Sequence, residues 1–274
     1  MGNLCHKNTA PDVIKKIPPK DIQIEGFKEF HEDLFDIIFQ FNAYRFFRIE
    51  EIVFLLKQNF ASVKEDINDV QFAIFYEKKI LRNSIISEKT LNDQILYSKF
   101  KVFSEKSFSV LNKAFKSYYK NLKGEKYDSK STVPFVCLLP WALLYGEGRN
   151  DVKIDFIYNY FSNDKGELSL TDDFRFFLFA LFAIPSAVAL FTFQLITEEN
   201  EDFKKLIEKY DFETIFSGYE VKDAVHCTDL MLKALFGDST SINYIDFKTK
   251  FLERKFQLLI CPKGIRSYIN ENNI

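Results

Sequence analysis

The sequence predicts an all-α protein. From Phe27 onward, apolar residues recur at intervals of three and four, which is typical of amphipathic helices. The strict alternation of half-buried strands is absent, and so are the Asn-Gly and Asp-Gly pairs that mark tight hairpins. With 274 residues, of which 47% are hydrophobic, the chain has ample material for one large or two ordinary helical domains.

The first part of the helical body, residues 21–105, is expected to hold four helices. The first carries one apolar stripe, made of Phe27, Phe30, Leu34, Ile37, Ile38 and Phe41. A second helix is expected over residues 46–60, and two more near residues 67–82 and 88–104.

The second part, residues 106–274, repeats one pattern three times. An amphipathic helix is followed by a short polar loop with a glycine and then by a second helix. The first round starts with FSVLNKAFKSYY, the second with VKIDFIYNYF and the third with TDLMLKALF. This spacing predicts helix–loop–helix units.

The run LLPWALLYGEGRNDVKIDFIYNYFSNDKGELSLTDDF resembles the middle of EF-hand proteins of the calcineurin B and neuronal calcium sensor type. The resemblance covers residues 106–274 and implies EF-hand-like pairs. Residues 21–105 match no such motif, and two alternatives stay open for them: a further degenerate pair or an added helical cap.

The predicted loops lack the ligands of a calcium site. A twelve-residue calcium loop needs oxygen ligands at positions 1, 3, 5 and 12 and a glycine at position 6. With Gly166 at position 6, Phe161 falls at position 1 and Lys165 at position 5. The first loop has lysines at ligand positions, and the third is two residues short.

We therefore expect no metal and no cofactor. The weak candidates for calcium are Asp164, Asp172 and Asp173 in and beside the second loop. A calcium-sensor regulatory protein remains as an alternative.

Residues 176–196 form an apolar run of 21 residues without charge, long enough to span a bilayer. Pro185 and Ser186 lie at its centre, a capping signal precedes it, and the acidic stretch TEENED follows it. We favour two buried helices over a transmembrane helix. In a third interpretation, the phenylalanine-rich surface lines an apolar groove that takes a partner helix.

Residues 1–20 are expected to be a flexible tether that carries lipids. The start MGNLCHK offers Gly2 for myristate and Cys5 for palmitate, although His6 stands where the myristoylation pattern has Ser or Thr. One myristoyl chain binds a membrane only marginally, so a second chain or a basic patch is needed. The resemblance points the same way, because such EF-hand proteins are often N-myristoylated.

Lysines provide a candidate patch for anionic lipid, because each lysine near a membrane surface adds about 1 kcal/mol to the binding free energy. They are Lys7, Lys15, Lys16 and Lys20 of the tether and Lys113, Lys116, Lys120 and Lys123 of a helix. The alternative is an ordinary solvated face. With a net charge of −2 and a pI near 6.0, the chain gives no reason to expect a nucleic-acid partner.

No catalytic motif is present in the chain, and its four cysteines form no CxxC pair. His226 adjoins Cys227, but neighbouring residues on a helix point in different directions. The sequence therefore predicts a non-enzymatic adaptor that binds a partner protein at the cytoplasmic face of a membrane. The alternative is an integral or complex-bound subunit with a transmembrane helix near residues 176–196.

Overall fold

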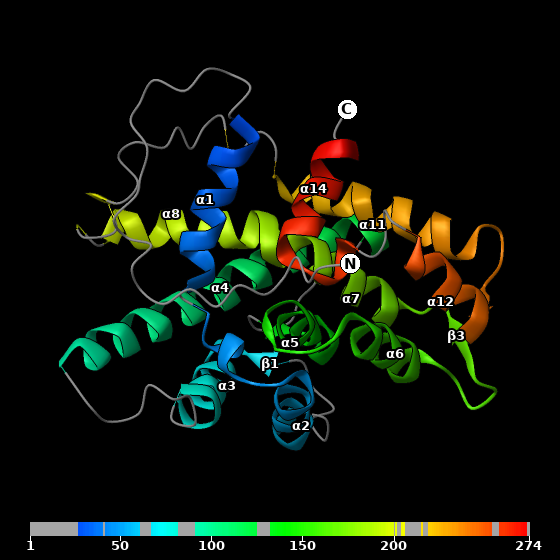
Figure 1. Cartoon of the computed structure of the whole chain (residues 1–274), viewed down its shortest axis with the longest axis horizontal. Helices are drawn as coiled ribbons and strands as arrows, with labels where there is room; N and C mark the ends of the chain where they lie inside the picture. The colour runs from blue at the N-terminus through cyan, green and yellow to red at the C-terminus, as the bar shows by residue number, and fades with distance from the viewer. Residues whose placement is uncertain are drawn as a thin grey trace.

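The computed structural model describes residues 27–40, 42–60, 67–81, 91–124, 132–199, 201, 204–205, 215, 219–253 and 258–272. The all-α prediction is confirmed (Figure 1). The α-helices are α1 (Phe27–Gln40), α2 (Ile49–Phe60), α3 (Asp69–Phe75), α4 (Leu91–Lys123), α5 (Leu139–Tyr145), α6 (Asn150–Phe161), α7 (Asp172–Ala183), α8 (Ala189–Glu199), α11 (Val221–Phe236), α12 (Tyr244–Leu252) and α14 (Pro262–Asn272). Short helical turns η3 (Ala43–Phe46), η4 (Tyr76–Leu81), η5 (Phe135–Leu138), η6 (Ile184–Val188) and η7 (Leu258–Ile260) extend or connect them.

Two short antiparallel ribbons join the loops between helices. Strand β1 (Ile67–Asn68) pairs with β2 (Thr132–Val133), and β3 (Glu167–Ser169) pairs with β4 (Ser241–Asn243). In the first ribbon Ile67 lies opposite Val133, and in the second Leu168 lies opposite Ile242. All four side chains are buried, so each ribbon places an apolar pair between its helices.

The ribbons connect four helix–loop–helix units into two pairs. The first pair consists of α2 with α3 and α4 with η5 and α5; the second consists of α6 with α7 and α11 with α12. Three glycines follow the first helix of their units, and all adopt positive φ: Gly124, Gly166 and Gly237. A glycine reaches this conformation without the steric cost that a side chain would impose. Strand β1 of the first ribbon lies before residue 106 and its partner β2 lies after it.

Helix α4 is longer than the sequence predicts. Its 33 residues merge the helices expected at residues 88–104 and 108–119, and the expected boundary between residues 105 and 106 falls inside it. Ser104 and Ser107 resemble a polar break in the sequence, yet both are buried in the fold. Their small side chains fit inside the fold, so these two polar residues continue the helix.

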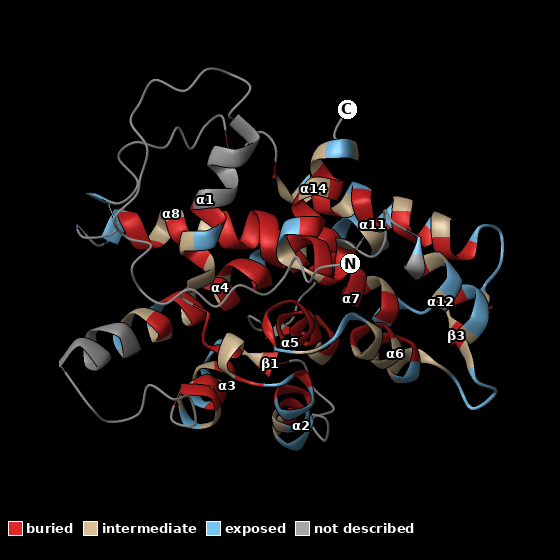
Figure 2. Cartoon of the chain, in the orientation of Figure 1, coloured by how far each residue is buried: buried red, intermediate tan, exposed pale blue. Residues whose placement is uncertain are grey.

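The apolar run lies at the centre of the molecule. Helix α7, the π-helical turn η6 and helix α8 form one helical segment from Asp172 to Glu199, and it is long and apolar enough to cross a membrane. However, 94% of its most apolar window is buried inside the fold (Figure 2). Helix α7 packs against α11 and α5, and α8 packs against α4. The chain thus forms one continuous helical segment here and not two separate helices. Its burial inside the fold explains why it is so apolar.

The π-helical turn occurs at Pro185, which has no N–H to continue the ladder of the helix. The hydroxyl of Ser186 donates to the carbonyl of Phe182 at 2.6 Å, which satisfies a backbone acceptor near the turn. The guanidinium of Arg266 in α14 donates to the carbonyl of Pro185 at 3.2 Å. The C-terminal helix is thereby tied to the middle of the central segment.

Candidate functional site

The predicted lipidation sites and the tether lysines lie outside the described residues. These are Gly2, Cys5, Lys7, Lys15, Lys16 and Lys20. The lipid anchor therefore stays a prediction.

The predicted helical lysines lie together on the last part of α4. Lys113, Lys116 and Lys120 are exposed or partly exposed, and they follow one another at intervals of three and four residues, on one face of the helix. Lys123 also lies on this face, but its Nζ is 2.7 Å from a carboxylate oxygen of Asp172. Hydrogen bonding to Asp172 raises the pKa of Lys123.

The loop between α6 and α7 is closed by the side chain of Asn163. Its Oδ1 accepts the N–H groups of Lys165 at 2.9 Å and Glu167 at 3.1 Å, and its Nδ2 donates to the hydroxyl of Ser169 at 3.2 Å. Its backbone N–H donates to the carbonyl of Glu167, and its carbonyl accepts the N–H of Gly166. One asparagine thus connects the two ends of the loop.

Neighbouring groups occupy further oxygen atoms of this loop. The hydroxyl of Tyr158 in α6 donates to the carbonyl of Gly166. The hydroxyl of Ser241 in β4 donates to a carboxylate oxygen of Glu167 at 3.3 Å. A calcium ion needs six to eight oxygen ligands directed at one point, whereas these oxygens accept bonds from the protein itself. The donor set of this loop does not fit calcium.

The three aspartates named as weak calcium candidates do not converge. Asp164 lies on the exposed turn, and Asp172 forms the ion pair with Lys123. Asp173 lies in the first turn of α7, where burial and then the charge of Asp172 raise the pKa of its carboxyl. Across the described ranges, no three His, Cys, Asp or Glu side chains are placed to hold a metal ion.

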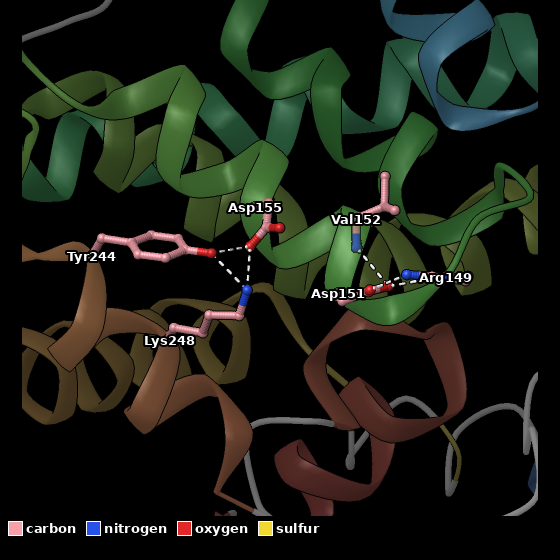
Figure 3. Close-up of polar contacts among 6 residues, drawn as sticks. All are labelled: Arg149, Asp151, Val152, Asp155, Tyr244 and Lys248. Carbon is pink, nitrogen blue, oxygen red and sulfur yellow. Dashed lines mark hydrogen bonds and ion pairs between the residues drawn. The ribbon is translucent and has the colours of Figure 1, made fainter.

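A polar cluster connects α6 to α12 (Figure 3). The hydroxyl of Tyr244 donates to Asp155 Oδ1 at 2.7 Å, and Lys248 Nζ lies 2.9 Å from the same oxygen. Lys248 also donates to the Tyr244 oxygen at 2.6 Å. The hydrogen bond from Lys248 lowers the pKa of Asp155, and the bonds to Tyr244 and Asp155 raise the pKa of Lys248. The cluster joins the two units that the second ribbon pairs.

A second group in the same view consists of Arg149 and Asp151 at the start of α6. The guanidinium of Arg149 donates to both carboxylate oxygens of Asp151, and this bonding lowers the pKa of the Asp151 carboxyl. Asp151 also accepts the N–H of Val152 at 3.0 Å. This ion pair is local to the first turn of the helix and does not bridge helices.

Cys227 and His226 do not form a catalytic pair. Cys227 is fully buried in α11, whereas His226 is exposed on the same helix. Burial, and to a lesser extent the charge of Asp223, raises the pKa of the Cys227 thiol to about 12. Because only the thiolate is a strong nucleophile, Cys227 stays unreactive near neutral pH.

The apolar groove for a partner helix is not formed by the phenylalanines of α7. Those side chains pack inside the fold, as the ring pairs Phe174–Phe236 and Phe115–Phe176 illustrate. A shallow hollow lies instead on α2, lined by Phe47, Glu50, Glu51, Phe54 and Leu55. Phe54 is 64% exposed there.

Compared with known protein families, curated proteins and solved structures, the chain matches none, so these comparisons lend no support to the resemblance to EF-hand proteins.

Sequence reasoning did not identify Asn163 or the Asp155 cluster. Asn163 lies beside Asp164, but the calcium-loop pattern treats these side chains as metal ligands and does not reveal that the amide bonds to backbone groups of the loop. In the cluster, only the spacing of Tyr244 and Lys248, four residues apart on one helix, is visible in the sequence. Asp155 lies 89 residues before Tyr244, so the fold was needed to bring them together.

Proposed function

We propose that this protein is a non-enzymatic adaptor at the cytoplasmic face of a membrane, anchored by lipids on Gly2 and Cys5, and built of EF-hand-like units that do not use calcium. The observation that carries the proposal is the loop of Asn163, whose oxygen atoms are engaged by the protein's own donors. A loop closed in this way holds its helices in place without a metal ion. Such a unit serves as a fixed scaffold for a protein partner.

The paired arrangement supports the EF-hand-like part of the proposal. Leu168 and Ile242 meet in the second ribbon, and Ile67 and Val133 meet in the first. The second ribbon joins the loops of two helix–loop–helix units within residues 106–274, which agrees with the periodicity of that region. The first ribbon favours a further helix–loop–helix unit over an added cap for the N-terminal region, because β1 of that region pairs with β2 of the following unit. That unit would pair with the first round of residues 106–274, and the region would not contain a complete pair of its own.

Burial of the central segment favours a lipid anchor over a transmembrane helix. In a bilayer the side chains of Asp172–Glu199 would face lipid, yet most of this segment contacts other helices of the same chain. Moving this segment out of the fold and into a bilayer would expose the core to water or would require the whole fold to open. Its length and apolar composition still favour an integral subunit as the second candidate function.

Membrane extraction distinguishes the two functions. In cells, we expect the wild-type chain to sediment with membranes, while Gly2→Ala becomes soluble. Asn3→Ala, which leaves Gly2 in place, is the matched control and should stay on membranes. A Gly2→Ala chain that resists carbonate extraction would contradict the lipid anchor and favour the integral subunit.

Calcium titration tests the metal-independent scaffold. Calorimetry of the purified chain with calcium should show no binding heat, and the melting temperature should not change on addition of calcium or a chelator. A saturable heat that disappears in Asp164→Ala would instead favour the calcium-sensor alternative.

A further inference from the structure

Among the lysines of α4, two sets of three differ in their partners. Three of them form ion pairs: Lys101 with Glu77, Lys106 with Glu199, and Lys123 with Asp172. Lys113, Lys116 and Lys120 form no ion pair with any residue that the structure describes. The unpaired lysines are consecutive along one face and span about 10 Å of the helix.

The sequence around them contains no compensating acid. From Ser107 to Lys123 the helix has neither Asp nor Glu, so no carboxylate one turn away offsets these charges. Lysines near the end of a helix interact favourably with its dipole, but that effect is confined to the last turn. Lys113 and Lys116 lie before that turn and need another explanation.

The opposite face of α4 is fixed to the core. The ring of Phe115 meets that of Phe176 edge to face at 5.0 Å, and Tyr118 stacks on Phe179 at 4.3 Å. These aromatic contacts hold the helix in one rotational setting, so the three lysines all point outward. Tyr119 lies beside them, partly exposed, where a tyrosine suits the boundary between water and lipid.

We propose that Lys113, Lys116 and Lys120 form an anion-docking face that lays α4 against a membrane surface rich in acidic phospholipid headgroups. The inference rests on the proposed function, because a lipid chain brings the face to the membrane. Lys123, which pairs with Asp172, is not part of this face. The side of the fold that carries Lys113, Lys116 and Lys120 is the side that meets the bilayer. Three separate positive charges in a row on a convex helix can each bind a different headgroup, because lipid headgroups move freely in the plane of the membrane.

Vesicle binding tests this face. The N-myristoylated full chain is titrated with vesicles of phosphatidylcholine, with and without phosphatidylserine, and compared with Lys113→Gln/Lys116→Gln/Lys120→Gln. Three lysines at about 1 kcal/mol each correspond to a loss of about 100-fold in affinity for the acidic vesicles. Binding to neutral vesicles should not change, and the difference should shrink with added salt.

The matched control is Lys165→Gln/Lys233→Gln/Lys263→Gln. These lysines are also exposed and without an ion pair among the described residues, and the variant has the same net charge. It should bind acidic vesicles like the wild type. An equal loss in both variants would show that only net charge matters and would overturn the proposed face. Far-ultraviolet circular dichroism of each variant establishes that the fold is retained.

A fluorescent probe gives a second measurement on the folded chain. Ser117 is exposed between Lys113 and Lys120, and Ser239 is exposed in the turn after α11. An environment-sensitive dye on Ser117→Cys should shift to the blue on acidic vesicles, whereas the same dye on Ser239→Cys should not. Both variants are made with Cys5 and Cys261 replaced by serine. A shift at Ser239 alone would overturn the orientation.

The outcomes separate the inference from the function on which it rests. If the triple variant binds acidic vesicles like the wild type while Gly2→Ala is released from membranes, the lysine face is wrong and the anchor stands. If the triple variant loses binding to acidic vesicles while Gly2→Ala keeps its location in cells, the result supports the lysine face and contradicts the lipid anchor. If the triple variant loses binding to RNA or to an acidic polypeptide but not to vesicles, the assigned partner is wrong.

Discussion

At the scale of single residues, Arg266 shows how a charged side chain can serve the core. Its guanidinium lies 4.0 Å from the ring centroid of Phe35 in α1 and donates to Pro185 in the central segment. The residue is only 4% exposed. It therefore connects three parts of the chain that are far apart in sequence, through a cation–π contact and a charge-assisted hydrogen bond.

Replacing Arg266 should lower the free energy of unfolding by more than a substitution on the surface does. Arg266→Ala removes the stem, the ring contact and the donor to Pro185, so we expect the free energy of unfolding to fall by about 2 to 3 kcal/mol. Urea denaturation measures the change, with Arg149→Ala as an exposed control. A change within about 0.5 kcal/mol would contradict the role given to Arg266.

The cysteines should differ sharply in reactivity. Cys137 and Cys227 are buried, and the raised pKa of Cys227 keeps its thiol protonated, while Cys261 is partly exposed. In a Cys5→Ser chain, iodoacetamide near neutral pH should label Cys261 and leave the other two intact until urea is added. Mass spectrometry of the peptides reads out each site. Rapid labelling of Cys227 in the folded chain would refute its assigned burial.

At the scale of elements, the loop of Asn163 and the cluster of Asp155 hold the second pair together by different means. The loop is fixed within itself by neutral hydrogen bonds, whereas the cluster joins α6 to α12 through an ion pair. The first should be insensitive to salt, and the second should weaken as salt screens it.

Asn163→Ala should destabilise the second pair by about 1 kcal/mol, because two N–H groups lose their acceptor. Asn121, an exposed asparagine on α4, provides the control substitution Asn121→Ala. Thermal denaturation of both variants measures the difference. If calcium restored the stability of Asn163→Ala, the loop would be a metal site after all.

The ion pair of Asp155 and Lys248 should make stability depend on pH in the acid range. The folded pKa of Asp155 is lower than its unfolded value near 3.9, so ionised Asp155 stabilises the fold. This contribution is fully present above the unfolded pKa and is lost as the pH falls through the folded pKa. Lys248→Met should be less stable than the wild type at neutral pH and low salt.

Below the folded pKa of Asp155, the two chains should unfold with nearly equal free energies. Urea denaturation over a pH series provides the comparison. A difference that persisted at the acid end would mean that Lys248 stabilises the fold through its packing on Tyr244 and not through its charge.

At this scale, apolar periodicity predicts the helices of the chain better than its strands. Helices α1, α2 and α6 lie close to their predicted ranges, and α3 together with η4 covers the range predicted near residues 67–82, because apolar residues recur at helical spacing in each. The ribbons could not be predicted, because strands of two or three residues are too short to show alternation. The break expected between residues 104 and 108 is absent because Ser104 and Ser107 are buried against the rest of the fold, which no local pattern reveals.

At the scale of the whole molecule, the two pairs of units share a central core rather than forming separate bodies. The central segment contacts α4 and α5 of the first pair and α11 of the second, and α14 packs against α11, η6 and α7. Gly2 and Cys5 of the predicted tether lie outside the described residues, and their lipidation stays a prediction from the sequence.

The continuous helix α4 has a consequence for how the molecule comes apart. Phe108 of α4 stacks on Phe72 of α3, whereas Phe115 and Tyr118 further along the same helix pack on α7. Neither pair can therefore lose its structure while the other keeps a complete helix. Heat should therefore melt the described fold in a single cooperative step, with the calorimetric enthalpy equal to the van't Hoff enthalpy. Fragments cut between residues 105 and 106 should remain unfolded when separate, and two resolved transitions would show that the halves are independent.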